Sequence, residues 1–169
     1  MKLTEKQELL LNKYKEQIKR RERPGLNNLY KNDKGIVLTN SIILTLLKDI
    51  EYNEQLEYPQ FNMDNIINLE GDFIKECKTS ELFNILKPFR YKGYKKRTIN
   101  ISSDGEVSEG DNKDNYNCNF NYLYLAIKLI NDFKDDKATL YINNRNLVIE
   151  SKNVKTVIAG IRVKGSILW

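Results

Sequence analysis

The 169-residue sequence contains no histidine and only two cysteines, Cys77 and Cys118. The lack of histidine excludes serine–histidine and cysteine–histidine catalysis, and it excludes histidine-ligated metal sites. Two cysteines are too few for a cysteine-only structural zinc site, and they do not indicate the disulfide framework of a small secreted protein. We therefore expect both cysteines to be reduced, partly buried and structurally ordinary, and we expect neither a metal nor a cofactor.

Long apolar runs are also missing. No stretch approaches the roughly 20 apolar residues that a membrane span needs, and the first six residues lack the apolar centre of a signal peptide. A composition of 40% hydrophobic and 30% charged residues is typical of a soluble globular chain. The sequence predicts a cytoplasmic protein without a membrane partner, and its length fits one domain.

Basic residues outnumber acidic residues, and the two kinds are unevenly distributed along the chain. The net charge is +5. Residues 1–34 and 75–97 are rich in lysine and arginine, whereas residues 35–74 and 98–120 are rich in aspartate and glutamate. A basic zone is expected of a protein that binds the phosphate backbone of a nucleic acid. The alternative interpretation is a solvated surface of mixed charge.

Two helices are predicted from capping signals and from apolar residues at helical spacing. Thr4 and Gln7 have the spacing of a capping box, so the first helix should cover residues 5–23 and end at Pro24. Asn119 or Asn121 should cap the second helix, which continues to about residue 133. The apolar face of the first helix contains Leu3, Leu10, Leu11, Tyr14 and Ile18. The second should bury Tyr122, Leu123, Ala126, Leu129, Ile130 and Phe133, and expose Tyr124, Lys128, Asn131 and Asp132 without net charge.

Strand signals surround these helices. Strands are expected at residues 26–31, 36–38, 42–47, 98–102, 138–143, 147–151 and 156–163. A short helix at residues 81–86 should be capped by Thr79 or Ser80, and residues 104–117 should form a polar loop. The order is helix–βββ and then β–helix–βββ, which predicts an α+β fold with a pseudo-duplicated pattern and both helices on one face of an antiparallel sheet. We expect one domain at 1–163, with halves at about 1–67 and 98–163 joined by a short helix and basic loop at 68–97, and an extension at 164–169.

Several short motifs resemble those of bacterial sliding clamps, the β subunit of the replicative polymerase. Residues 120–128 resemble the opening of the last clamp helix, residues 147–151 its "leucine-x-isoleucine-x-serine" strand, and residues 157–163 its closing strand. Residues 34–41 are similar to the clamp hairpin with Thr-Asp/Asn-Gly, and residues 58–61, followed by Ile66, are similar to its Tyr-Pro-x-Tyr segment. The resemblance covers about residues 26–67 and 119–163, and it implies a clamp-like fold.

The resemblance also implies a way of contacting DNA. In clamps the helices line a channel and present basic residues to phosphates without reading bases. Here Lys2, Lys6, Lys13 and Arg20 form such a stripe on the first helix. The sequence departs from the family in having room for one domain rather than three, in Gly160 at a proline position, and in the C-terminal extension.

The segment at residues 87–97 has the most distinctive chemistry. Six of its eleven residues are basic and three are aromatic. Basic side chains follow phosphates, and aromatic rings stack on unpaired bases. A solvent-exposed loop whose rings pack back on the core is the equally weighted alternative. The candidate nucleic-acid contacts are Lys6, Lys13, Arg20, Lys87, Arg90, Tyr91, Lys92, Tyr94, Lys95, Lys96 and Arg97.

Two other features have a structural and a functional interpretation. The acidic residues of the 104–117 loop are spaced unlike those of a helix-loop-helix calcium site, so a solvated loop is favoured over a metal site; such a loop could also mimic phosphates toward a basic partner. They are Asp104, Glu106, Glu109, Asp111 and Asp114. Trp169 is expected to dock on its own domain, and the alternative is a partner-binding role.

The sequence is compatible with three classes of function. The leading hypothesis is a non-catalytic, clamp-like accessory protein of a phage, plasmid or low-GC bacterium that contacts DNA or replication proteins through sequence-independent electrostatics. The second is a mobile-element protein that binds and inhibits a host replication or defence protein. An enzyme ranks third, because the sequence has no glycosidase-like carboxylate pair, no phosphate-binding glycine motif and no nucleophile elbow. The oligomeric state stays open.

Overall fold

The computed structural model describes residues 2–19, 28–50, 52, 56–57, 59, 62–90, 97–143 and 145–163. Its strands form two antiparallel sheets. The larger sheet has the strand order β1-β2-β3-β10-β9-β8-β4, and the smaller has the order β6-β5-β7. The strands of the larger sheet are β1 (Leu29–Asn32), β2 (Gly35–Thr39), β3 (Ile43–Lys48), β4 (Asp72–Lys78), β8 (Lys137–Asn143), β9 (Asn146–Ser151) and β10 (Val154–Ala159). Those of the smaller are β5 (Thr98–Ile101), β6 (Val107–Glu109) and β7 (Tyr116–Asn119).

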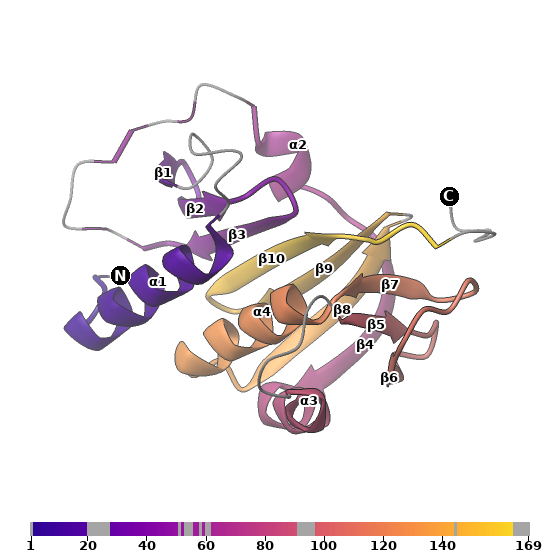
Figure 1. The fold of residues 1–169 in the computed structure, drawn as a ribbon. Coiled ribbons are helices and arrows are strands. Elements are labelled where there is room, and N and C mark those ends of the chain that lie inside the picture. The colour runs from indigo at the N-terminus through magenta and orange to yellow at the C-terminus, as the bar shows by residue number, and fades with distance from the viewer. Residues whose placement is uncertain are drawn as a thin grey trace.

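The longer helices lie side by side over one face of the seven-stranded sheet (Figure 1). They are α1 (Glu5–Ile18), α4 (Phe120–Asp132) and α3 (Thr79–Leu86), which continues into the 3-10 turn η2 (Lys87–Phe89). The short helix α2 (Asp64–Ile67) packs on the opposite face, which we call the outer face of the sheet. The predicted α+β class, with the two main helices over one face of an antiparallel sheet, is confirmed.

Burial on both faces explains the apolar sequence of the central strands. Successive side chains of a strand point to opposite faces. Ile43 and Leu47 of β3 therefore pack in the main core beneath the helices, while Leu44 and Leu46 belong to a second cluster on the outer face. Met63 and Ile67 cover this second cluster. As a result, the segment that contains α2 is part of the packed structure.

Several predicted boundaries were wrong. The first helix ends at Ile18 rather than at Arg23, with Lys19 in a non-helical conformation. Helix α3 begins at Thr79, so Thr79 and Ser80 lie inside the helix and neither caps it. The Thr79 hydroxyl instead donates to the Asp135 carbonyl at 2.6 Å. The last strand ends at Ala159 rather than at residue 163.

The strands β4, β6 and β7, the helix α2 and the turn η2 were not predicted from the sequence, and β7 begins inside the predicted polar loop. Strand β4 is half-exposed and rich in charge, so its sequence lacks a regular alternation of apolar residues. Strand β6 has only one apolar residue and lies within the predicted polar loop. Helix α2 is a single turn without a side-chain cap. In each case pairing or packing with distant residues compensates for a weak local preference.

Two glycines lie where the backbone geometry excludes other residues: at one position any side chain, and at the other proline. Gly35 has φ of 143°, and a Cβ at this position would lie 1.9 Å from the carbonyl oxygen of Leu47. Gly160, which occupies the position of a clamp proline, donates its backbone N–H to the Arg145 carbonyl at 2.7 Å. Proline could not make this hydrogen bond, because it has no backbone N–H.

Candidate nucleic-acid interface

Helix α1 is held on the sheet by apolar and polar contacts along one side. Leu11, Tyr14 and Ile18 are buried beneath it. The Tyr14 hydroxyl lies 2.7 Å from the Thr45 hydroxyl, which lies 3.1 Å from that of Thr156. This buried chain of hydroxyls joins the helix to β3 and β10. Burial raises the pKa of Tyr14, although the hydrogen bond from Thr45 opposes the shift.

The end of α1 is fixed by the turn between β2 and β3. The side-chain amide of Asn40 donates to the Ile18 carbonyl at 2.7 Å and to the Tyr122 hydroxyl at 3.1 Å. Its carbonyl oxygen accepts the backbone N–H groups of Ile42 and Ile43, each at 2.9 Å. Asn40 is fully buried, so a single turn residue sets the position of α1 relative to α4.

The predicted basic stripe lies beside the buried side of α1 and begins at Lys2, just before the helix. Lys2, Lys6 and Lys13 are exposed, and none forms an ion pair within the described part of the chain. Lys6 and Lys13 are seven residues apart, which places them two turns and about 10 Å apart along the same side of the helix. Arg20, the last member of the predicted stripe, lies outside the described residues.

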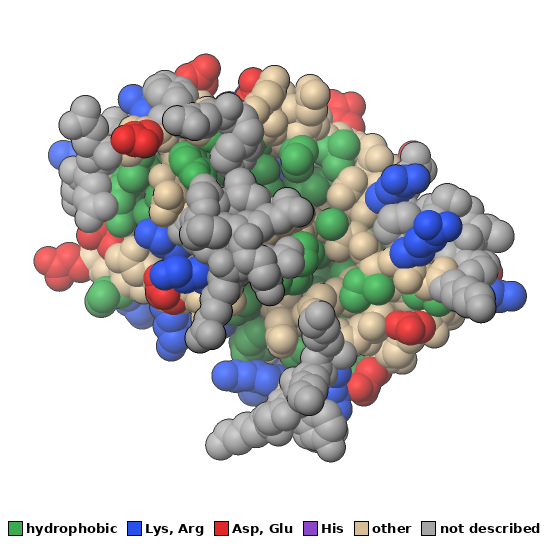
Figure 2. Space-filling view, turned by 45° about the horizontal axis from the view of Figure 1, so that its top comes forward, with side chains coloured by type: hydrophobic (Ala, Val, Ile, Leu, Met, Phe, Trp, Pro, Cys, Tyr) green, Lys and Arg blue, Asp and Glu red, His purple; other side chains and the backbone are tan. Residues whose placement is uncertain are grey.

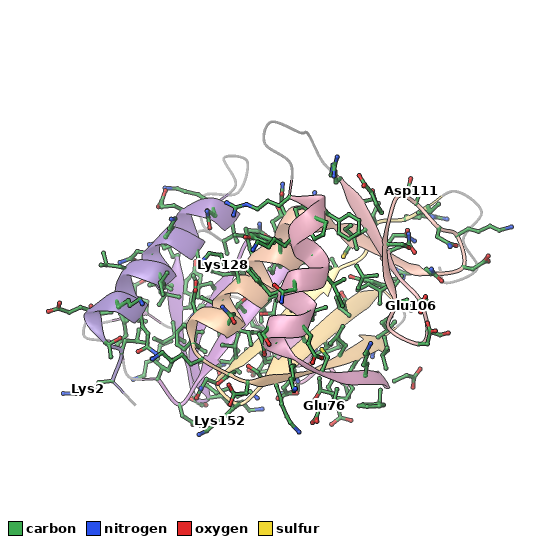
Figure 3. The ribbon with its side chains drawn as sticks, turned by 90° about the horizontal axis from the view of Figure 1, so that it is seen from below. Lys2, Glu76, Glu106, Asp111, Lys128 and Lys152 are labelled. Carbon is green, nitrogen blue, oxygen red and sulfur yellow. The ribbon has the colours of Figure 1, made fainter. Side chains whose placement is uncertain are left out.

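Helix α4 separates this stripe from α3 and contributes no net charge. Lys128 forms an ion pair with Asp132 one turn later on the same helix. Lys13 and Lys128 line the seam between α1 and α4, which is closely packed around a cavity of only about 10 Å³. Figure 3 shows Lys128 on α4, between α1 and α3. The predicted neutral exposed side of α4 is thus present, but Tyr124 was wrongly assigned to it.

Tyr124 is buried because α3 packs against this part of α4. Its ring centroid lies 5.5 Å from that of Phe83 on α3 and 5.6 Å from that of Phe120. The guanidinium carbon of Arg90 lies 5.2 Å from the Tyr124 centroid, in cation–π geometry. Helical periodicity could not identify this contact, since the position of α3 is set by the tertiary fold.

The described ends of the basic segment meet near the N-terminus of α4. Arg97 donates to the Phe89 carbonyl at 3.1 Å and forms an ion pair with Glu109 at 3.1 Å. Its own carbonyl accepts the backbone N–H of Phe120 at 2.9 Å. The charge of Arg97 is therefore balanced within the protein, whereas Lys87 and Arg90 are exposed. Tyr91, Lys92, Tyr94, Lys95 and Lys96 lie outside the described residues, as does Trp169.

The acidic loop lies on the side of the small sheet. Glu106 and Asp111 are exposed there, away from α1 (Figure 3). Asp104 accepts a hydrogen bond from the Ser102 hydroxyl, which lowers the pKa of this carboxyl. In the described part of the chain, no group of three or more acidic or cysteine side chains is arranged to hold a metal ion.

Both cysteines lie among the described residues and are ordinary structural thiols. Cys118 is fully buried, which raises the pKa of its thiol to about 12, and Cys77 is half-buried. Both are free thiols. Figure 2 shows positive and negative side chains interspersed over the face it presents. None of the described helices is long and apolar enough to cross a membrane.

Comparison with known proteins identifies the fold. No protein-family model and no curated protein sequence matches this chain. Among solved structures, DNA polymerase III subunit β of Pseudomonas aeruginosa superposes with a TM-score of 0.63 at 11% identity, over 95% of this chain and 65% of that one. The β subunit of Borrelia burgdorferi, in complex with a natural product, gives a TM-score of 0.59 at 15% identity, over 94% and 62%. The sliding clamp of Bartonella birtlesii bound to griselimycin gives 0.58 at 12% identity, over 94% and 63%.

The fold is therefore that of bacterial sliding clamps, and the resemblance noted in the sequence is confirmed at the level of the fold. The chain spans less than two thirds of the length of each of these clamp chains.

Proposed function

We propose that this protein is a non-catalytic, clamp-like accessory protein that contacts DNA through its helical layer. Lys6 and Lys13 on α1 would bind phosphates, together with Lys2 just before the helix and the basic segment at residues 87–97. The contacts would be electrostatic and independent of base sequence. The observation that carries this proposal is an exposed lysine stripe on one helix of the layer, in a chain with the fold of sliding clamps.

The distribution of charge supports an asymmetric contact. The middle helix of the layer pairs its own lysine with Asp132, so the exposed basic side chains available to phosphates are those of the stripe on α1 and of the η2 end of α3. Arg97 is paired with Glu109, and we expect it to hold the basic segment in place rather than to bind phosphate. A contact made by a few lysines is weak, and it should depend on salt concentration.

The test is fluorescence anisotropy with duplex and single-stranded DNA across a salt series. Changing Lys6 and Lys13 together to glutamine should weaken binding and reduce the salt slope by about 2, because each phosphate contact contributes about 0.9 to the slope on duplex DNA. A second pair, Lys87→Gln with Arg90→Gln, tests the other end of the layer.

The matched control is Lys75→Gln with Lys152→Gln. These lysines are also exposed, and they lie on β4 and in the β9–β10 turn rather than on a helix. This pair changes net charge by the same amount and should leave most of the affinity in place. Equal losses in the control and test pairs would reject a localised interface, and no binding at low salt would reject DNA contact altogether.

A second candidate function is inhibition of a host replication or defence protein by direct binding. The neutral centre of the helical layer favours it. An apolar protein interface should persist at salt concentrations that remove phosphate contacts. Binding to a host protein that survives at high salt, without DNA binding at low salt, would support this candidate.

A further inference from the structure

The outer face of the seven-stranded sheet contains a cavity of about 710 Å³ that the proposed DNA contact does not use. The chain between α2 and β4 crosses over this face and forms one wall. The turn between β1 and β2 and the end of β3 form another. Lys48, Glu150 and Lys155 lie on the floor, on β3, β9 and β10. Because these side chains alternate with core residues, they point away from the helical layer.

Two lysines on this floor share one carboxylate. Lys48 Nζ donates to Glu150 Oε1 at 2.6 Å and to the Ser151 carbonyl at 2.9 Å. Lys155 Nζ lies 3.7 Å from Glu150 Oε2, and its side chain is only 13% exposed. An ammonium has three donors, and a buried charge is costly unless it is paired and hydrogen-bonded. Lys155 thus retains donor capacity in a mostly buried position on the cavity floor.

One carboxylate lies between the two floor lysines, and the other carboxylates of the lining stand at the rim. Burial is the largest influence on Glu150 and opposes its ionisation, but the hydrogen bonds and charges of Lys48 and Lys155 together outweigh it and lower the pKa of this carboxyl. Glu150 is therefore ionised at neutral pH and supplies a single negative charge to two ammonium groups. A third lysine, Lys34, lines the cavity and donates to the neutral side-chain amide of Asn68.

The remaining walls limit the kind of ligand that fits. Leu46, Ile67 and Leu69 supply apolar surface, and Tyr141 supplies an aromatic ring that is held edge-to-face by Phe73 at a centroid distance of 6.2 Å. Three exposed carboxylates stand at the rim, which disfavours a polyanion such as DNA. They are Asp33, Asp49 and Glu70.

We propose that this cavity binds a small ligand with one compact anionic group, a phosphate or a carboxylate, and an apolar or aromatic body. The anionic group would accept hydrogen bonds from Lys155 and Lys48 at the floor, and Lys34 would contact it from the side. The body would lie against Tyr141 and the leucines. This site is independent of the helical layer, which lies on the other face of the sheet.

The experiment is an NMR titration of the ¹⁵N-labelled full-length protein with three probes: inorganic phosphate, benzoate and adenosine monophosphate. Benzoate and phosphate distinguish the carboxylate from the phosphate. The expected result is saturable shifts at residues 46–48, 67–71 and 150–155 for at least one probe. Tighter binding of benzoate or adenosine monophosphate than of phosphate would show that the body contributes.

Lys155→Gln should weaken binding about tenfold, because a charge-assisted hydrogen bond contributes about 1.5–3 kcal/mol. Lys152→Gln is the matched control, since it removes an exposed lysine from the adjacent turn and should change affinity by less than about twofold. If Lys155→Gln does not fold, Lys34→Gln replaces it, because Lys34 is exposed and makes no contact with Glu150. The proposal is overturned if no probe gives saturable shifts, or if the shifts survive unchanged in the folded lysine variant.

Discussion

Tyr14 shows how a single polar side chain can position a helix. Its ring is buried between α1 and the sheet, and its hydroxyl begins the buried chain that continues through Thr45 and Thr156. A buried hydroxyl must be hydrogen-bonded, so this chain favours one position of the helix over others of similar apolar contact. The placement of the exposed lysines beside this buried side of α1 depends on that position.

Tyr14→Phe should lower the free energy of unfolding by about 1 kcal/mol at neutral pH, because it removes one buried hydrogen bond. The pKa of Tyr14 is raised in the native state, so at alkaline pH the unfolded chain releases a proton that the native chain retains. Stability should therefore fall as pH rises above about 10, the ordinary tyrosine pKa, by up to about 1.4 kcal/mol per pH unit for this group.

Urea unfolding between pH 7 and pH 11 measures this effect. Tyr116 is also buried with a raised pKa, so the alkaline loss should be reduced rather than abolished in Tyr14→Phe. An unchanged alkaline slope in the variant would contradict the assignment of Tyr14 to this transition.

At the scale of the element, helix starts are the features that local sequence specifies best. Thr4 and Gln7 form the predicted capping box, with the Gln7 backbone N–H donating to the Thr4 hydroxyl at 3.3 Å and the Thr4 backbone N–H donating to the side-chain Oε1 of Gln7 at 3.0 Å. Asn119 caps α4, as one of the two predicted possibilities. Both caps use residues within three positions of the helix start, so they do not depend on the rest of the fold.

Thr4→Ala should destabilise the protein by about 1 kcal/mol through loss of this cap. Ser80→Ala, in the first turn of α3, serves as control, because that helix has no side-chain cap. Thermal unfolding of the two variants compares them directly. A larger effect at Ser80 than at Thr4 would contradict the description of the two helix starts.

At the scale of the whole molecule, the second apolar cluster, on the outer face of the sheet, makes the segment around α2 part of one folded unit. Met63 is only 3% exposed and covers Val37, Leu44 and Leu46 across the sheet. The same segment continues into one wall of the cavity on the outer face of the sheet. Loss of its packing should therefore affect both the stability of the sheet and the shape of the cavity.

Met63→Ala should lower the free energy of unfolding by about 2–4 kcal/mol, as expected for a large buried side chain. Ile66→Ala, in the helix that Met63 precedes but 45% exposed, should cost less than about 1 kcal/mol. Chemical denaturation followed by far-UV circular dichroism gives both values. Equal and small effects would indicate that the segment is not packed as part of the core.

The sequence by itself determined the fold class, the starts of α1 and α4, and most strands of the large sheet. These features depend on near neighbours: a cap three residues away, or apolar residues repeated at the period of a strand. The exposure of Lys6 and Lys13 also followed from the helical repeat, once the buried side of α1 was known.

Only the tertiary structure decided the features that depend on distant residues. Strand β4 forms because β8 supplies its hydrogen bonds, Tyr124 is buried because α3 covers it, and Arg97 is paired because β6 places Glu109 beside it. Lys48 and Glu150 come from β3 and β9, which lie on either side of β10 only after the sheet has assembled. Such contacts join residues far apart in the chain, so no local pattern encodes them, and they exist only when the competing entropy of the chain has been overcome by packing of the whole domain.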